Sequence, residues 1–233
     1  MKRCRSYRPA GGLPSLPVPR RAEESRYPAE MLTANVATTV HGRYLYEDRG
    51  AERLLVGFHG YAEAAEVNFA ELGKIAAIER WSLVSIQALH PFYTRSGDVV
   101  ASWMTKLDRE LAVEDNLSYV RNVLASLPTP RRLVFSGFSQ GASMAARAAA
   151  QVECAGLIML GGDVPPDVKS NDGQLPPVLL ARGTRDDWYS EEKFAADLAF
   201  LRMKTRVTPC IFDGGHEWSD AFRAAAAEFL AAI

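Results

Sequence analysis

The chain has 233 residues, 48% of them hydrophobic, and a formal net charge of −1 at pH 7. This length suits one substantial domain with a sizeable core and is short for two. The near-neutral charge gives no indication of a nucleic-acid partner or an acidic membrane surface, and no apolar stretch approaches the ~18 residues of a membrane-spanning helix.

The cysteines and the N-terminus bear on where the protein works. Cys4, Cys154 and Cys210 are far apart and lack metal-binding spacing, and such a sparse, odd number fits a reducing cytoplasm. Residues 1–35 read as an irregular extension rich in arginine and proline, whose prolines interrupt the 7–15-residue apolar centre of an export signal. An ordered extension, a disordered one and a start codon upstream of the true one all remain open. We expect a cytoplasmic protein.

The expected regular elements alternate along the rest of the chain. Continuous apolar runs predict strands buried on both faces, and helical spacing of apolar residues predicts helices. The expected strands are Thr38–Asp48 (one or two, at a sheet edge), Arg53–His59, Trp81–Gln87, Leu133–Phe135, Ala155–Gly161, Pro177–Arg182 and Val207–Phe212. The expected helices are 66–80, 108–126, 142–150, 190–203 and 217–232. The stretches 88–106 and 162–176 are expected to be irregular loops.

This alternation predicts one α/β domain over residues 36–233. Its central sheet is mostly parallel, with helices on both faces. Active sites in such folds lie at the carboxyl ends of the strands, so residues just after each strand are the ones to compare.

One strand–turn–helix stretch carries a catalytic pattern. Ser139 lies between Gly137 and Gly141, in the G-x-S-x-G spacing of a nucleophile elbow. The tight turn leaves no room for flanking side chains and presents the serine hydroxyl at the start of a helix, whose free N–H groups favour negative charge.

A serine nucleophile needs a base, and the base needs an orienting acid. In the chain order Ser, acid, His, only His216 of the four histidines follows Ser139, and it comes directly after the last strand. Asp186 is the favoured acid, three residues beyond Gly183, and Asp163 is the runner-up. Asp187 reads as a solvated neighbour.

The remaining expectations concern the oxyanion and the substrate. The backbone N–H of Gln140, next to the nucleophile, and that of Tyr61, after an earlier strand, are the expected oxyanion donors. His59 is expected to shape that loop through hydrogen bonds. Trp103 and Trp218 are candidates for substrate contact, with core packing as the alternative for both.

At these residues the sequence resembles the phospholipase/carboxylesterase family of α/β-hydrolases, which includes acyl-protein thioesterases and small carboxylesterases. The resemblance covers roughly residues 53–233 and rests on the segments Phe58-His59-Gly60, Ser102-Trp103, Phe135–Ala142, Gly183–Asp186 and Gly215–Trp218. It implies an α/β-hydrolase fold with little or no cap domain. It also implies Ser139, Asp186 and His216 as the triad, and hydrolysis of carboxylic esters or thioesters without metal or cofactor.

Two departures leave the substrate open. The oxyanion loop continues Tyr61-Ala62-Glu63 where such proteins often carry another glycine, and Trp188-Tyr189 follow the acid motif in place of a Val-Pro pair. We expect a serine hydrolase that acts on a small-molecule ester, and a homodimer is compatible with this interpretation. An acyltransferase or peptidase on the same fold and a non-catalytic binding protein are the alternatives.

Overall fold

The computed structural model describes residues 33–233, and the folded unit that carries the site comprises Val40–Ile233. Residues 33–42 contain no helix or strand. The expectation of an irregular N-terminal extension falls almost entirely on residues 1–32, which lie outside the described part of the chain.

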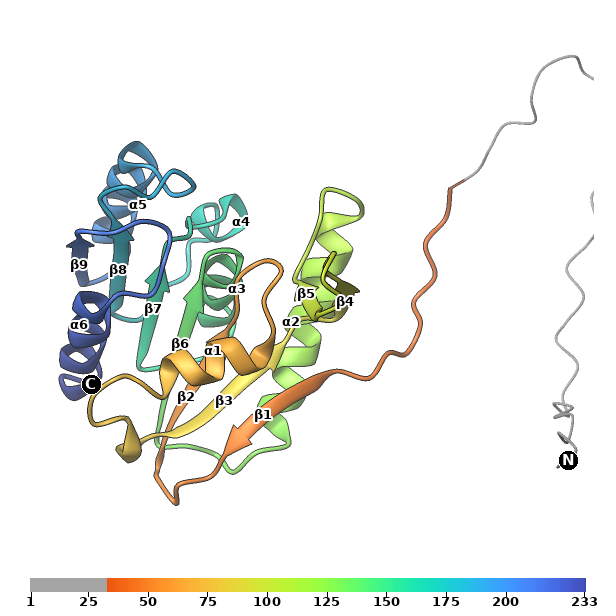
Figure 1. Ribbon diagram of the computed structural model, residues 1–233, viewed down its shortest axis with the longest axis horizontal. Helices are drawn as coiled ribbons and strands as arrows, with labels where there is room; N and C mark the ends of the chain where they lie inside the picture. Colours follow the sequence, from red (N-terminus) through yellow and green to blue (C-terminus); the bar gives the residue numbers. More distant parts are fainter. Residues whose placement is uncertain (1–32) are drawn as a thin grey trace, which may run out of the picture. The chain divides into compact units, whose positions relative to one another are not determined.

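A seven-stranded sheet forms the centre of this unit (Figure 1). Its strand order is β1-β3-β2-β6-β7-β8-β9, and every neighbouring pair is parallel except β1 with β3. The strands are β1 (Arg43–Glu47), β2 (Arg53–Phe58), β3 (Ser82–Gln87), β6 (Arg132–Phe138), β7 (Gly156–Leu160), β8 (Val178–Gly183) and β9 (Val207–Phe212). The predicted α/β fold with a mostly parallel sheet is therefore confirmed, including a strand at one edge from within Thr38–Asp48.

Side chains on the inner strands alternate between two cores. In β2, Leu54, Val56 and Phe58 enter one cluster, whereas Leu55 enters the other. The same alternation holds for β3, β6, β7 and β8, because successive residues of a strand point to opposite faces. Both faces of the sheet are buried, which explains why these strands read as unbroken apolar runs.

Helices cover both faces, as the sequence predicts. Residues of α2, α3, α4 and α5 pack in one cluster and residues of α1 and α6 in the other. The helices are α1 (Ala65–Leu72), α2 (Arg109–Ala125), α3 (Gln140–Ala149), α4 (Pro166–Lys169), α5 (Glu191–Lys204) and α6 (Asp220–Ala231), with a 3-10 turn η1 at Ile78–Arg80.

Three local expectations need correction. The helix expected over 66–80 ends at Leu72, because the chain turns at Gly73 and Ala77 then adopts a left-handed φ of 59°. The stretch expected to be irregular over 88–106 contains an antiparallel hairpin, β4 (His90–Tyr93) and β5 (Val99–Ser102). The loop expected over 162–176 contains the short helix α4.

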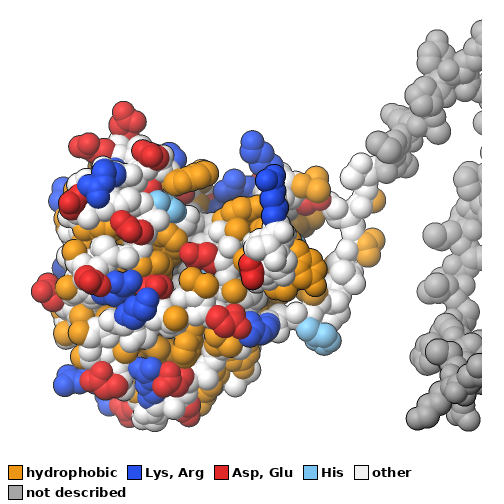
Figure 2. All heavy atoms as spheres, viewed as in Figure 1, with side chains coloured by type: hydrophobic (Ala, Val, Ile, Leu, Met, Phe, Trp, Pro, Cys, Tyr) orange, Lys and Arg blue, Asp and Glu red, His pale blue; other side chains and the backbone are white. Residues whose placement is uncertain are grey.

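Charged side chains are spread over the visible surface. On the face shown in Figure 2, acidic and basic side chains are interspersed over the folded unit. Among residues 33–233, every helix is too short or too polar to cross a membrane.

Candidate active site

Ser139 lies at the sharp turn between β6 and α3. Its backbone has a φ of 54° and a ψ of −121°, a conformation that costs a non-glycine residue about 1–3 kcal/mol and is held only by the surrounding structure. A Cβ at Gly137 would lie 2.2 Å from the Gly141 carbonyl oxygen, and one at Gly141 would lie 2.1 Å from that of Phe58. Both glycines are therefore required by close backbone approach.

Ser139, His216 and Asp186 form a continuous chain of hydrogen bonds. His216 Nε2 lies 2.8 Å from Ser139 Oγ, and His216 Nδ1 lies 2.9 Å from Asp186 Oδ2. The other carboxylate oxygen of Asp186, which is buried, accepts the backbone N–H groups of Trp188 and Tyr189, each at 2.9 Å. These bonds fix the carboxylate, and the carboxylate in turn fixes the imidazole ring.

Of the two acids compared from sequence, only Asp186 is seen against His216. Asp163, the runner-up, follows β7 and faces Ser143, whose hydroxyl donates to the Asp163 carbonyl oxygen at 2.9 Å and to its carboxylate at 3.2 Å. Asp187 is exposed, as the solvated-neighbour interpretation expects.

The acid loop and the histidine loop are held together by their backbones. The Thr184 N–H donates to the Phe212 carbonyl and the Arg185 N–H to the Gly214 carbonyl, both at 2.8 Å. A Cβ at Gly183 would lie 2.3 Å from the Gly215 carbonyl oxygen. The loops after β8 and β9 thus behave as one packed unit that sets the Asp186–His216 distance.

The loop after β2 passes beside Ser139 and is held in place by hydrogen bonds to the β4–β5 hairpin. Ala62 N–H donates to the Ala101 carbonyl at 3.0 Å, and Ala101 N–H returns a bond to Glu63 at 2.9 Å. The Tyr61 ring is 58% exposed and packs 5.6 Å from the Phe92 ring of β4. The β4–β5 hairpin therefore supports the loop after β2 through backbone hydrogen bonds and an aromatic contact.

Glu63 stabilises the same loop from inside. Its carboxylate accepts the Gly60 N–H at 2.7 Å, and burial raises its pKa, against the opposing effects of that hydrogen bond and of the nearby His216. Sequence reasoning noted Glu63 only as a departure from glycine, because its hydrogen bond depends on how the loop folds back.

His59 shapes this loop, as expected. Its buried ring donates from Nδ1 to the Gly60 carbonyl at 2.7 Å and accepts the Ala88 N–H at Nε2 at 3.1 Å, so this pattern selects the tautomer protonated at Nδ1. Burial lowers the pKa of His59 to about 4, partly offset by the bond to Gly60. The ring is therefore neutral at pH 7.

Trp103 is a core residue and does not line the cavity beside Ser139. It is fully buried against Phe58 and His59, and its indole N–H donates to the His59 carbonyl at 2.8 Å. Its backbone N–H donates to the Gln140 side-chain oxygen at 2.9 Å. Of the two interpretations given for Trp103, its burial favours packing in the core.

Trp218 lies behind the histidine. Its ring packs 5.8 Å from that of Phe138, and Phe138 lies 4.8 Å from the His216 ring. It does not belong to the residues that line the cavity beside Ser139, and its position favours packing behind His216.

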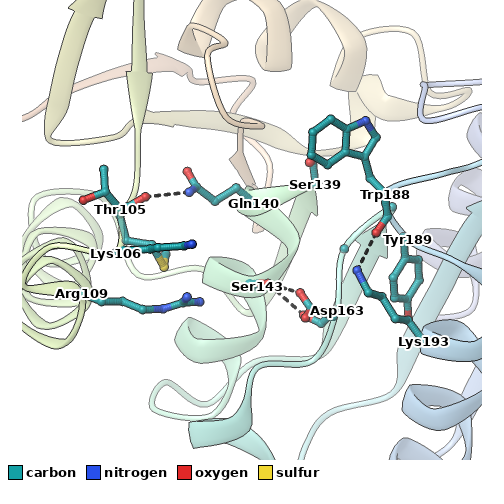
Figure 3. Close-up of a pocket in the computed structure, with 13 residues that line it drawn as sticks. Thr105, Lys106, Arg109, Ser139, Gln140, Ser143, Asp163, Trp188, Tyr189 and Lys193 are labelled. Atoms are coloured by element: carbon teal, nitrogen blue, oxygen red, sulfur yellow. Dashed lines mark hydrogen bonds between the residues drawn. The ribbon is translucent and has the colours of Figure 1, made fainter.

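A cavity of about 350 Å³ opens beside Ser139 (Figure 3). Most of the side chains that line this cavity are polar or charged. The complete lining consists of Met104, Thr105, Lys106, Arg109, Ser139, Gln140, Ser143, Gly161, Gly162, Asp163, Trp188, Tyr189 and Lys193. Trp188 is 75% exposed and lies 6.4 Å from the His216 ring, so Trp188 and Tyr189 form one wall of this cavity.

No group of His, Cys, Asp and Glu side chains within residues 33–233 is arranged to hold a metal ion.

Comparison with known proteins places the fold. The sequence matches no protein-family model and no curated protein. The structure resembles that of esterase PE8, with a TM-score of 0.70 and 23% identity over 82% of this chain and 98% of that one. A Mesorhizobium loti carboxylesterase gives a TM-score of 0.68 at 18% identity over 82% and 95%. Zea mays acyl-protein thioesterase 2 gives 0.66 at 17% identity over 82% and 99%. The chain thus shares the α/β-hydrolase fold of these proteins, which confirms the fold that the resemblance implies.

Proposed function

We propose that this chain is a serine hydrolase that cleaves carboxylic esters or thioesters through an acyl-enzyme, with residues 36–233 as its catalytic domain. The observation that carries the proposal is the hydrogen-bonded series Ser139–His216–Asp186, with distances of 2.8 and 2.9 Å at the strained turn after β6. A serine alone at a tight turn would need neither the histidine nor the buried acid behind it.

In the first step, Ser139 Oγ attacks the substrate carbonyl carbon while His216 Nε2 takes the hydroxyl proton. The tetrahedral adduct collapses, the bond to the leaving oxygen or sulfur breaks, and His216 gives its proton to that atom. In the second step, His216 removes a proton from water, the resulting hydroxide attacks the acyl-enzyme, and Ser139 leaves with the proton. Asp186 orients the imidazole and stabilises its charged form.

The negative charge on the carbonyl oxygen needs donors fixed in advance. We assign this role to the backbone N–H groups of Gln140 and Tyr61. Gln140 is the first residue of α3, so its N–H has no partner inside the helix. The Gln140 side chain, which donates to the Met104 carbonyl at 2.9 Å, and the Glu63 bond to Gly60 hold the two donors rigid.

The test combines labelling with three substitutions. A fluorophosphonate probe is expected to attach to Ser139. Ser139→Ala is expected to lower kcat on a short 4-nitrophenyl ester by about 10³-fold or more, and Asp186→Asn by about 10²–10⁴-fold, because the wrong imidazole tautomer is then favoured. Asp163→Asn is the matched control, with an expected loss below about tenfold.

Three results would overturn the proposal. An absence of labelling at Ser139 would favour a binding protein, and equal, mild losses in the two aspartate variants would mean that neither acid serves His216. If a low concentration of added alcohol takes most of the acyl group in preference to water, the protein is an acyltransferase instead.

A further inference from the structure

Three basic side chains in the cavity beside Ser139 have no part in the chemistry proposed above. Lys106 lies in the loop just before α2, Arg109 is the first residue of α2, and Lys193 comes from α5 on the other side. Figure 3 shows Lys106 and Arg109 extending side by side toward the middle of the cavity, whereas Lys193 turns back toward Trp188. The Lys193 ammonium donates to the Trp188 carbonyl at 2.8 Å, so it has a structural partner.

Lys106 and Arg109 differ from Lys193 in this respect. Both are exposed, and neither forms a hydrogen bond or ion pair with another residue of the 33–233 segment. Asp167, whose charge interacts with that of Arg109, is already held by two 2.7 Å bonds from the Arg147 guanidinium. Asp163, the acid that lines the cavity, accepts the Ser143 hydroxyl instead. The two cations are therefore available to an anion in the cavity.

Helix stability does not explain these cations. Arg109 is the first residue of α2. Basic side chains are disfavoured at this position, because the helix dipole is positive at its N-terminus. An anion bound between Lys106 and Arg109 would be favoured by both side chains and by the helix start.

Size and polarity limit what else the ligand contains. A cavity of about 350 Å³ is at the small end of the range for ligand pockets, roughly 300–1,000 Å³. Most of its lining side chains carry a polar or charged group, although polar and apolar atoms contribute nearly equal shares of the lining surface. A long alkyl chain would cover the charged ends of Lys106 and Arg109 without giving them a partner.

We propose that the substrate is a small carboxylic ester or thioester that carries a carboxylate or phosphate group, bound by Lys106 and Arg109 while Ser139 attacks the carbonyl. This inference rests on the proposed hydrolase function. The guanidinium fork binds two oxygens of such an anion at once, and the ammonium adds a third contact. The anion lies on the α2 side, away from the Asp163 carboxylate.

Paired substrates test the preference and separate the two kinds of anion. The carboxylate arm compares mono-(4-nitrophenyl) adipate with its neutral methyl ester. The phosphate arm compares 2-(butanoyloxy)ethyl phosphate with neutral 2-methoxyethyl butanoate. After correction for the uncatalysed rates, we expect kcat/KM to be about tenfold or more higher for the charged member of at least one pair, through a lower KM. Added salt is expected to reduce this ratio.

Variants assign the preference to the two side chains. Lys106→Gln and Arg109→Gln are each expected to lower kcat/KM for the charged ester about tenfold more than for the neutral one. Arg202→Gln removes an exposed cation near the end of α5 and outside the cavity. It is expected to leave kcat/KM unchanged for both the charged and the neutral ester.

The outcomes separate this inference from the function beneath it. If both neutral esters are hydrolysed by Ser139 but neither charged ester is preferred, the anion site is overturned and the hydrolase stands. The same conclusion follows if Lys106→Gln and Arg109→Gln lower kcat/KM equally for charged and neutral esters. If no ester is cleaved and no probe labels Ser139, the hydrolase proposal fails and the anion inference fails with it.

Discussion

Among single residues, Glu63 holds the loop that carries the proposed oxyanion donor Tyr61. Its carboxylate accepts the buried Gly60 N–H at 2.7 Å. Glu63→Ala leaves that N–H unpaired, so we expect kcat to fall about tenfold with KM changed less than about twofold, since a displaced donor affects the transition state most. Glu63→Gln keeps an acceptor oxygen and should retain kcat within about threefold. Steady-state kinetics on a short 4-nitrophenyl ester measure both variants.

The charge of Glu63 has a separate effect on stability. Because burial raises the pKa of Glu63, the folded protein holds this proton more tightly than the unfolded chain does. The contribution of Glu63 to stability is therefore present below its unfolded pKa and lost as pH rises through the raised value. Glu63→Gln should gain stability relative to wild type between acidic and neutral pH. An equal loss of kcat in the Gln and Ala variants would contradict the role as a hydrogen-bond acceptor.

Between elements, the contact of α3 with the end of β2 fixes the position of Ser139. A Cβ at Gly141 would lie 2.1 Å from the Phe58 carbonyl oxygen and 2.5 Å from that of His59, and both atoms belong to backbone. We expect Gly141→Ala to lower the free energy of unfolding by about 3 kcal/mol or more, and to lower kcat with it. Urea unfolding followed by circular dichroism measures the first effect.

Gly73, just after α1, is the matched control. Its φ of −63° suits any residue, and a Cβ there would meet nothing closer than 3.5 Å. Gly73→Ala is expected to raise stability by about 0.4–1 kcal/mol through the unfolded chain. If Gly141→Ala were as stable as the wild type, the close approach of α3 to β2 would not be the constraint inferred here.

The elements predictable from sequence are those whose pattern has a single physical cause. The bounds of α2 are predictable within a residue at each end, because its buried face includes Ala112, Leu117, Val120 and Val123 at helical spacing. The bounds of Val207–Phe212 also agree with the prediction, although only Phe212 of this edge strand is buried. The end of α1 is not predictable from this pattern, because the buried Ile75 and Ile78 continue the helical spacing of apolar residues although they lie in turns after the helix. The β4–β5 hairpin was missed because its two strands have four residues each, too few to show alternation.

At the scale of the whole molecule, the site gathers loops that are distant in sequence. Ser139, Asp186 and His216 were identifiable because glycine spacing and chain order restrict where each can stand. Glu63 and Lys106 had no such signal, since their roles depend on which loops the sheet brings together. Trp103 illustrates the same limit, because a tryptophan in a loop reads alike whether it lines a cavity or packs in the core.

Acid stability is a property of the whole fold that one buried residue should dominate in a defined pH window. His59 joins the ends of β2 and β3 through its bonds to Gly60 and Ala88, and burial lowers its pKa to about 4. The unfolded chain, with a histidine pKa near 6.5, binds the proton more tightly, so stability from this group is full above about pH 6.5 and is lost as pH falls toward 4. We expect the free energy of unfolding to drop by about 3 kcal/mol across that window through His59 alone. Urea titrations at several pH values, compared with those of His59→Gln, isolate the contribution, because glutamine does not titrate. The variant should be less stable at pH 7, and its free energy of unfolding should fall less between pH 6.5 and 4. Parallel curves of stability against pH for the two proteins would show that protonation of His59 does not destabilise the fold.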